Sequence, residues 1–511
     1  MAVICSMALL LAGGLYAREH GPLRNIRADK RGPNPGKLYK ISSLPAEEAK
    51  QVSPPQLPDT SGYTAEAVRA QMPDVFPVSL AVQNLEDSYV KVKRLLPMFG
   101  EMQQTLDPSA IVIIDGVYDL KTITDTVNDP QKIRRGENGE YILQVPILIK
   151  PDGTLLIKDG EHLVMSVSHR ALISSFGHLY VVGADVKGWN LEEDKPAEFK
   201  ENEAFRPYIV AWCGSEMNLA GSTFSHLGYF DSKAYGITYT SCNDTIYEED
   251  FGGLPGAKGW VVDNRFEDIY YGFYSYESHD IPIVRNTYVN NVIYGIDPHD
   301  RSKNLIIAYN TVRGSHKKHG IIISREVDNS FIFHNVSEKN AGSGFMLDRD
   351  SVNNVIAYNI LRQNDGDGLT FYESPDNLSY GNIMTGNKNS GMRIRNSWNI
   401  TSAEDVISRN GVAGVQAYTS ELSEEKRDLE MDPYQQKVSA RITAPEMVGN
   451  QEAHFKMQDV ERLALSHLKV FKSPDRFFGG ELKGGNIELR PDLYESGKGV
   501  LIEHKEKAGT P

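Results

Sequence analysis

Cysteine is scarce in this chain, which holds three in 511 residues. Cys5 falls in the apolar run at the N-terminus, so only Cys213 and Cys242 remain to form a disulfide in the rest of the chain. That pair could bond in an oxidising compartment. Two inert buried thiols are an equally good interpretation of the sequence.

Positive charge is also in short supply. The chain has 54 Lys and Arg against 68 Asp and Glu, which gives a formal net charge of −14. Proteins that bind nucleic acid usually present a basic surface, so the sequence predicts no nucleic-acid partner. An anionic ligand would have to meet a local cluster of basic side chains that overcomes the overall field.

Long hydrophobic runs are absent except at the start of the chain. Residues 3–15 form an apolar run about as long as a signal-peptide core and too short to span a bilayer, although no Lys or Arg precedes it. We therefore expect residues 1–17 to be a signal peptide. The mature protein should be exported and should make no stable membrane insertion.

What the sequence has in abundance is a repeat marked by glycine and asparagine. A Gly that opens an apolar-x-apolar segment recurs every 23 to 25 residues, and asparagines keep the same phase. Seven copies in one phase are very unlikely by chance. The glycines are Gly272, Gly295, Gly320, Gly344, Gly368, Gly391 and Gly414, and the asparagines include Asn286, Asn310, Asn335, Asn359 and Asn382.

A repeat of this length, with several short strands per copy, is typical of one coil of a parallel β-helix. The leucine-rich horseshoe has a similar period, but its Leu-x-x-Leu-x-Leu pattern is missing. A β-sandwich rich in Gly and Asn would not keep the phase over so many copies. The chain is therefore predicted to be all-β and to form a right-handed parallel β-helix, a solenoid.

The segments outside the repeat predict the domain organisation. Residues 20–75 are rich in Pro, Lys and Ser, and residues 18–110 are predicted to be an N-terminal extension or cap, whereas residues 111–418 are predicted to be the β-helix catalytic domain. Beyond this point a highly charged segment interrupts the glycine phase, and residues 457–471 have a helical pattern. Because solenoids need caps over their open ends, residues 419–511 are predicted to form a C-terminal cap that also serves as a lid.

Alternation along each repeated strand predicts which side chains face outward. Positions one and three after the Gly are mostly apolar, as in Ile321 and Ile323, and should face the core. Positions two and four should then point out of the β-helix. With one arginine just beyond its strand, they predict a substrate-binding face of Tyr274, Tyr276, Ser324, Asp348, Arg349, Tyr372, Arg393 and Arg395.

This face suits an acidic polysaccharide. Aromatic rings match the faces of sugars, and arginines bind carboxylates through paired hydrogen bonds. Stacked strands lie about 4.8 Å apart, so a polymer could run across several coils with about one sugar per coil. The plainer alternative is the solvated charged face that every solenoid has, and the clustering of Asp, His and Arg in adjacent coils argues against it.

The segment Asp297-Pro298-His299-Asp300 places a histidine between two carboxylates, with Arg325 one coil further on. A neighbouring carboxylate can orient an imidazole and raise its basicity. We expect His299 to remove the weakly acidic proton on the carbon next to a substrate carboxylate. Arg325 would neutralise that carboxylate and stabilise the enolate-like intermediate.

Other chemistries have weaker support in the sequence. Glycoside hydrolysis needs a pair of carboxylates, which Asp297, Asp300 and Asp348 could supply. Asp365 and Asp367 lack a full EF-hand pattern, and no calcium-binding nonapeptide is repeated. We therefore expect no metal site and no cofactor.

The phased repeat with YGIDPHDRS at 294–302 and GIIISR at 320–325 closely resembles the periplasmic mannuronan C5-epimerases of alginate-producing bacteria. The resemblance covers nearly the whole chain, and the Asp-Pro-His-Asp motif is specific in this context. It implies an isomerase that inverts residues of polymannuronate to guluronate at C5. It also implies that His299 is the base, that Arg325 neutralises the carboxylate and that water returns the proton.

The same resemblance implies a calcium-independent enzyme that works in the periplasm beside the alginate polymerisation and export proteins. The atypical start of the signal segment departs from the family pattern. Two alternatives stay open at this point. A polysaccharide lyase shares the abstraction step and then expels the 4-oxygen, and a non-catalytic scaffold would only hold the polymer during export.

Overall fold

The computed structural model describes residues 35–84, 109–200, 204–242, 253–423, 428–430, 432–471 and 477–507. The expected signal peptide, residues 1–17, lies outside these ranges. The chain forms two compact units, one of residues 57–342 and one of residues 1–56 together with 343–511. Within the described ranges, no helix has the length and apolarity that crossing a membrane requires.

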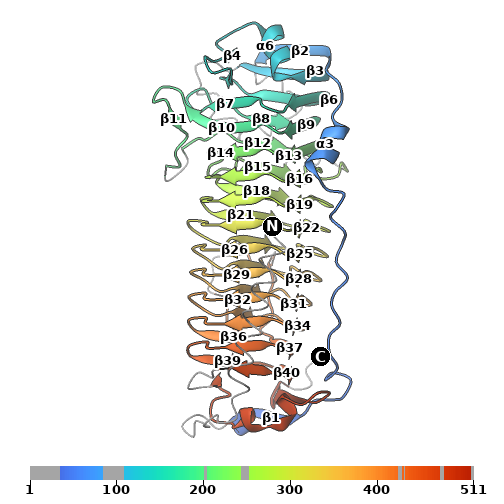
Figure 1. The fold of residues 1–511 in the computed structure, drawn as a ribbon, viewed down its shortest axis with the longest axis vertical. Coiled ribbons are helices and arrows are strands. Elements are labelled where there is room, and N and C mark those ends of the chain that lie inside the picture. The colour runs from blue at the N-terminus through green and yellow to red at the C-terminus, as the bar shows by residue number, and fades with distance from the viewer. Residues whose placement is uncertain are drawn as a thin grey trace. The chain divides into compact units, whose positions relative to one another are not determined.

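Residues 57–342 form a stack of coils in which short strands pair in parallel from one coil to the next, as β15, β18 and β21 do in Figure 1. The first column of strands carries the candidate site. It consists of β6 (Ile147–Ile157), β8 (Ile173–Ser175), β12 (Ile209–Ala211), β15 (Gly236–Thr240), β18 (Tyr271–Tyr276), β21 (Tyr294–His299) and β24 (Ile321–Ser324).

Two further columns complete the coils of this unit. The second consists of β9 (His178–Val182), β13 (Glu216–Ala220), β16 (Val261–Val262), β19 (Pro282–Val284), β22 (Ile306–Ala308) and β25 (Phe331–Phe333). The third consists of β5 (Tyr141–Leu143), β7 (His162–Ser166), β10 (Asp185–Asn190), β14 (Thr223–Ser225), β17 (Arg265–Glu267), β20 (Thr287–Val289), β23 (Thr311–Arg313) and β26 (Val336–Glu338).

The coils are preceded by a short antiparallel pair. β2 (Phe76–Asn84) runs antiparallel to β3 (Ser109–Asp119), and β3 then pairs in parallel with β6. The helix α6 (Leu120–Val127) begins at Asp119, whose side chain accepts a hydrogen bond from the Thr122 N–H. The other elements are α3 (Ala65–Gln71), β4 (Ile133–Arg135) and β11 (Lys195–Pro196).

The phased asparagines form a buried ladder at the turn between the second and third columns. Asn264, Asn286, Asn310 and Asn335 are each at most 3% exposed. The backbone N–H of each of the first three donates to Oδ1 of the next, at 2.9–3.0 Å. Each Nδ2 also donates to a carbonyl of the preceding coil, as that of Asn310 does to the Ile283 oxygen at 2.8 Å. The ladder thus satisfies turn groups that would otherwise be buried without partners.

The phased positions require glycine because a side chain there would clash with neighbouring atoms, and not because the backbone conformation is unusual. Of the seven in the repeat, none is among the residues with positive φ. A Cβ atom at Gly272 would lie 2.6 Å from the Tyr288 ring and 2.9 Å from Asn291 Nδ2. The core positions that follow the glycines, such as Phe273 and Ile296 at position one and Ile323 at position three, are completely buried. The expectation that positions one and three face the core is therefore confirmed.

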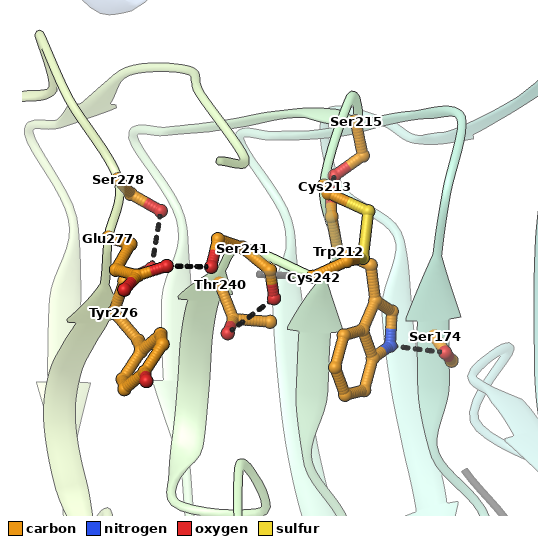
Figure 2. The surroundings of a disulfide bond; sticks show 10 residues. All are labelled: Ser174, Trp212, Cys213, Ser215, Thr240, Ser241, Cys242, Tyr276, Glu277 and Ser278. Carbon is orange, nitrogen blue, oxygen red and sulfur yellow. Dashed lines mark hydrogen bonds between the residues drawn. A yellow bond between two sulfur atoms is a disulfide. The ribbon is translucent and has the colours of Figure 1, made fainter. Parts of the chain in front are cut away.

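A disulfide joins Cys213, just after β12, to Cys242, just after β15 (Figure 2). Beside it, the indole Nε1 of Trp212 donates to Ser174 Oγ at 3.0 Å. Ser241, next to the second cysteine, donates to Glu277 Oε2 at 2.6 Å. The bond ties neighbouring coils together and decides between the two interpretations that the sequence left open.

Removal of this disulfide should weaken the coils around it. A Cys213→Ser, Cys242→Ser double variant is expected to lose about 3 kcal/mol of unfolding free energy, because the bond closes a loop of 29 residues. Guanidinium unfolding without reductant measures the difference. Reduction of the wild-type protein should give the same loss, and an unchanged midpoint in both experiments would contradict the prediction.

Residues 343–507 of the second unit repeat the three-column arrangement. Its first column is β27 (Phe345–Asp348), β30 (Leu369–Tyr372), β33 (Met392–Arg395), β36 (Ala413–Tyr418), β39 (Ala453–Gln458) and β42 (Phe478–Gly480). Its second is β28 (Val355–Ala357), β31 (Leu378–Tyr380), β34 (Ile400–Ala403), β37 (Ser439–Thr443) and β40 (Arg462–Ser466). Its third is β29 (Ile360–Arg362), β32 (Ile383–Thr385), β35 (Val406–Ser408), β38 (Glu446–Val448) and β41 (Lys469–Phe471).

The coils continue past Tyr418, so the predicted end of the β-helix at that residue is wrong. β37 and β39 pair in parallel with β34 and β36. The asparagine ladder also continues, because the Asn410 N–H donates to Asn450 Oδ1 at 3.1 Å across a separation of 40 residues. An insertion within one coil hid the phase. The predicted helix at 457–471 is wrong as well, because Leu463 and Leu465 alternate along a buried strand.

Antiparallel strands end the second column of this unit. β43 (Gly499–His504) runs antiparallel to β40, and β1 (Tyr39–Ser43) runs antiparallel to β43. Leu44 and Ala49 pack with Ala464 and Leu501 in one buried cluster. The N-terminal segment therefore supplies the last strand of the column. The short helices of this unit are α2 (Pro35–Leu38), η2 (Ile487–Leu489) and η3 (Pro491–Leu493).

Candidate active site

The candidate site lies on the first strand column of the unit 57–342. Tyr276 of β18, His299 of β21 and Ser324 of β24 occupy equivalent places in successive coils. Tyr274 and Asp297 form the neighbouring row. The predicted outward positions of this unit therefore align in two rows on one face, while Pro298 is buried on the core side as expected.

His299 ends β21 where the chain turns. Its side chain is 25% exposed, and its Nδ1 contacts Asp300 Oδ2. Asp300 Oδ1 lies 3.1 Å from Arg325 Nη1 in the next coil. The Asp300 N–H also donates to the Ser324 carbonyl at 2.9 Å. One carboxylate thus contacts both the predicted base and the predicted neutralising arginine.

Asp300 is held in its ionised form. Burial opposes its ionisation, but the His299 hydrogen bond and the charges of His299, Arg325 and Lys233 outweigh this effect and lower its pKa. An ionised carboxylate can only accept, so His299 Nδ1 carries the proton of the contact. In the neutral ring Nε2 then keeps the lone pair that a base requires.

A cluster of tyrosines borders His299 on the side of the preceding coils. The Tyr274 ring lies 5.9 Å from the imidazole, and Tyr235 packs edge-on to Tyr274 at 4.7 Å and stacks on Tyr271 at 4.6 Å. Burial and the negative charge of Asp297 raise the pKa of Tyr235 to about 12 and raise those of Tyr271 and Tyr274 as well. These hydroxyls therefore stay neutral at physiological pH.

Three charged residues that the sequence interpretation missed surround the same rows. Lys233 Nζ lies 3.2 Å from the centroid of the Tyr276 ring. Arg301 Nε donates to Glu277 Oε1 at 2.7 Å. Arg301 directly follows the Asp-Pro-His-Asp motif, so its position was a usable signal. Lys233 comes from the loop before β15, and the repeat gives no indication that this loop reaches the site.

The other predicted residues lie on the first column of the unit that contains residues 343–507. Asp348, Tyr372 and Arg395 are in register there on successive strands. The arginines of this face are each paired with a carboxylate, whereas the sequence predicted a row of arginines that would bind substrate carboxylates. The ion pairs are Arg349 Nε–Asp348 Oδ2 at 3.0 Å, Arg349 Nη1–Asp432 Oδ2 at 3.4 Å, Arg393 Nε–Asp367 Oδ2 at 2.7 Å and Arg395 Nη2–Glu373 Oε1 at 2.7 Å.

Several positions predicted to face solvent are buried. Tyr274, Asp297 and Thr370 are at most 6% exposed. Side chains from outside the repeat cover Tyr274, because Lys233 lies over its ring and Tyr235 packs against it. The alternation was interpreted correctly, but it cannot show what covers a face. At position four, Ser324 and Asp348 are also buried, contrary to expectation, whereas Tyr276, His299 and Arg395 are partly exposed.

The site offers an oriented imidazole, a guanidinium one coil away and neutral hydroxyls. In the part of the chain that the structure describes, no group of three or more His, Cys, Asp and Glu is placed to hold a metal ion. The arrangement suits proton transfer at a carbon next to a carboxylate.

Comparisons with known proteins identify the relatives of this chain. A family model described as periplasmic copper-binding protein (NosD) matches residues 184–365 and 231–414. The chain is 39% identical to the Mannuronan C5-epimerase of Pseudomonas aeruginosa, over 92% of this chain and 87% of that protein. It is 36% identical to the Mannuronan C5-epimerase AlgG of Azotobacter vinelandii, over 97% of this chain and 95% of that protein.

A solved structure agrees with these relatives. The crystal structure of the periplasmic alginate epimerase AlgG matches with a TM-score of 0.76 and 36% identity, covering 83% of this chain and 100% of that chain. The expected parallel β-helix and the resemblance stated from the motif are both confirmed. This chain belongs to the mannuronan C5-epimerase family.

Proposed function

We propose that the protein is a periplasmic isomerase that converts β-D-mannuronate to α-L-guluronate at C5 within the alginate polymer. The single observation that carries the proposal is that Asp300 contacts both His299 and Arg325. The family supports the substrate, since relatives over nearly the full length are mannuronan C5-epimerases. The relative of known structure is described as periplasmic.

In this mechanism His299 is the base. Its Nε2 takes the C5 proton, while Asp300 keeps the ring oriented and stabilises the imidazolium that forms. The C5 proton is weakly acidic as long as the neighbouring carboxylate keeps its charge. The base alone is therefore insufficient, and a cation must act on the carboxylate at the same time.

Arg325 supplies that cation. A guanidinium carries five N–H donors in a planar fork that matches a carboxylate, so one contact with Asp300 is compatible with binding a substrate carboxylate. As the proton leaves, charge moves onto the carboxylate oxygens, and a fixed guanidinium stabilises this enolate-like state more than the ground state.

Water returns the proton to the opposite face of the sugar in this proposal. The neighbouring hydroxyls of Tyr235, Tyr271 and Tyr274 have raised pKa values, which makes them poor proton donors to carbon. The neutral hydroxyls of the partly exposed Tyr235, Tyr271 and Tyr276 suit hydrogen bonds to sugar oxygens instead. The polar side chains that align on the first column of the other unit are proposed to hold further sugars of the polymer.

The family resemblance also underlies the proposal that the protein works with the periplasmic proteins that polymerise and export alginate. A pull-down of the protein from a periplasmic extract with and without bound polymannuronate would test it. Enrichment of no polymerisation or export protein in either sample would count against this part of the proposal.

The deciding experiment is proton NMR of polymannuronate after incubation with the protein in heavy water. Guluronate signals and deuterium at C5 are the expected result. A rise in the ultraviolet absorbance of unsaturated chain ends, without guluronate, would instead assign a lyase. A chain that binds the polymer and leaves it unchanged would be a scaffold, and both results would overturn the epimerase proposal.

Replacement of Arg325 by alanine should separate catalysis from binding. Turnover at saturation is expected to fall about 10²- to 10³-fold, because the developing charge loses its partner. Polymer affinity should weaken only modestly, since a polymer contacts the protein at many sugars besides the reacting one. Arg313→Ala, on the third column, serves as the matched control. A collapse of affinity with unchanged turnover at saturation would contradict the assigned role.

A further inference from the structure

A small pocket lies beside the strand excursion formed by β10 and β11, which Figure 1 shows next to the coils of this unit. Its volume is about 60 Å³, which is room for a few water molecules or one carboxylate-sized group. Arg206, three residues before β12, forms part of its wall. The other polar or charged lining residues are Asn190, Glu193, Lys195, Glu198 and Lys200.

Arg206 is a charged side chain with unfilled hydrogen-bonding capacity. It is 1% exposed, and its Nη2 contacts the carbonyl oxygen of Asp268 and lies 3.2 Å from Asp268 Oδ2. No acceptor among the described residues reaches its Nε or Nη1. Asp268 does not interact with Arg206 alone, because its Oδ2 also lies 2.8 Å from His226 Nδ1. A buried guanidinium with two unsatisfied donor atoms is costly, and an anion that accepts from one of them would lower that cost.

The charged residues that line the pocket are three cations and two carboxylates. Lys195 pairs with both carboxylates, Glu193 at 2.9 Å and Glu198 at 3.1 Å. Arg206 and the exposed Lys200 are the other positive groups of the lining, and they would face an entering ligand. Its two unfilled donors, Nε and Nη1, lie on opposite edges of the guanidinium, so an entering carboxylate would accept a charge-assisted hydrogen bond from one of them.

Arg206 lies just before β12, and β12 belongs to the strand column that carries His299. β12, β15, β18 and β21 are consecutive neighbours in it, with parallel pairing throughout. Three inter-strand steps correspond to about 14 Å along the column. A polyuronate with one sugar per coil would place a carboxylate near Arg206 when its third neighbour along the chain occupies the catalytic site.

Aromatic side chains connect the two places. The Arg206 guanidinium lies 6.0 Å from the Phe199 ring, and Phe199 packs against Tyr270 at 5.5 Å. Tyr270 stacks on Tyr271 at 5.0 Å, Tyr271 packs against Tyr274 at 5.8 Å, and the Tyr274 ring lies 5.9 Å from the His299 imidazole. Lys317 Nζ lies 4.8 Å from the Phe199 ring, at an exposed residue. Tyr270 and Tyr274 are buried, so Phe199, Tyr271 and Lys317 are the members of this series that an acidic sugar chain could contact.

We propose that the Arg206 pocket is a second uronate subsite, which binds the carboxylate of a sugar about three residues from the one that reacts at His299. The inference rests on the proposed function for its ligand, a polyuronate. The pocket would fix the polymer at a distance from the reaction centre. Chains too short to span both places would lose that anchor.

Calorimetric titration with mannuronate trimers and octamers tests the subsite. Arg206→Met is expected to raise the dissociation constant of the octamer about 10- to 100-fold, the range for a lost charged hydrogen-bond pair. The trimer should change by less than a factor of two. Arg265→Met, the same substitution on the third column, should change neither.

A second variant keeps the proposal testable if Arg206→Met fails to fold. Lys200 is exposed, and Lys200→Ala should weaken octamer binding about two- to five-fold with an unchanged melting temperature. An unchanged octamer affinity in Lys200→Ala and in folded Arg206→Met would overturn the proposal. An equal loss for trimer and octamer would also overturn it, because the effect would then not depend on reach.

Acetate as a free carboxylate distinguishes a polymer subsite from a site for small anions. Thermal stabilisation by acetate that is lost in Arg206→Met, without any dependence on oligomer length, would assign the pocket to a free anion and overturn the polymer ligand. Because these readouts measure binding, their outcome is independent of turnover. An octamer held through Arg206 by a protein that exchanges no C5 proton would refute the proposed function and leave the subsite standing.

Discussion

Deuterium uptake at C5 of polymannuronate should fall about 10³-fold when His299 is replaced by alanine. The imidazole is the one group on the two aligned rows that combines an ionised partner at Nδ1 with a free lone pair at Nε2 in its neutral form. Without it, Arg325 can still bind both Asp300 and a substrate carboxylate, but neither Asp300 nor Arg325 is a base of suitable strength. Binding should therefore persist while exchange stops.

NMR of the polymer in heavy water measures the exchange, and calorimetry measures the binding. His162→Ala is the control, since His162 begins β7 on the third column and is exposed. If His299→Ala takes up deuterium at the wild-type rate, the assignment of the base is wrong. If it neither binds nor exchanges but remains folded, His299 acts in substrate binding.

Replacement of Asn310 by alanine should cost about 3 kcal/mol or more of unfolding free energy. Its Oδ1 accepts from the Asn286 backbone N–H and from Asn286 Nδ2, at 2.9 and 3.1 Å. Its own Nδ2 donates to the Ile283 carbonyl at 2.8 Å. Alanine leaves these three buried groups without that partner, at about 1–3 kcal/mol each. Against a typical stability of about 5–15 kcal/mol, the loss is large.

Guanidinium unfolding of the two proteins measures this loss. Asn389→Ala is the control, because Asn389 is half-exposed and outside the ladder, so its substitution should shift stability by about 0.5 kcal/mol at most. An equal effect of the two substitutions would mean that the ladder contributes no more than an ordinary turn asparagine.

The fold could be predicted because its determinants recur. Each coil repeats the need for space at positions such as Gly272 and for a buried amide at positions such as Asn310, so the period survives variation elsewhere. The end of the repeat could not be predicted in the same way. An insertion after Tyr418 lengthens the spacing between Asn410 and Asn450 to 40 residues. The period is therefore lost in the sequence, although the hydrogen bond between the two asparagines is kept.

The centre of the site could be predicted from local sequence, because His299 and Asp300 are adjacent and Arg325 is one period away. Contacts that depend on long-range placement could not. Nothing in the sequence indicates that Lys233 lies over Tyr276, or that Asp367 pairs with Arg393. A strand pattern gives the direction of a side chain, whereas its partners depend on loops whose paths the pattern does not describe.

The pairing of β1 with β43 sets an order of events during biosynthesis. Most coil strands pair with strands about two dozen residues away, so they can assemble progressively. β1 instead pairs with β43, with Tyr39 opposite His504, and cannot pair until that strand exists. Until the end of the chain is present, β1 has no partner and the edge of β40 stays open, and open edges invite association with other chains. A chain truncated before residue 499 should therefore aggregate rather than persist as a shorter β-helix. β1 can therefore pair only after β43, the last strand of the chain that the structure describes, has been synthesised.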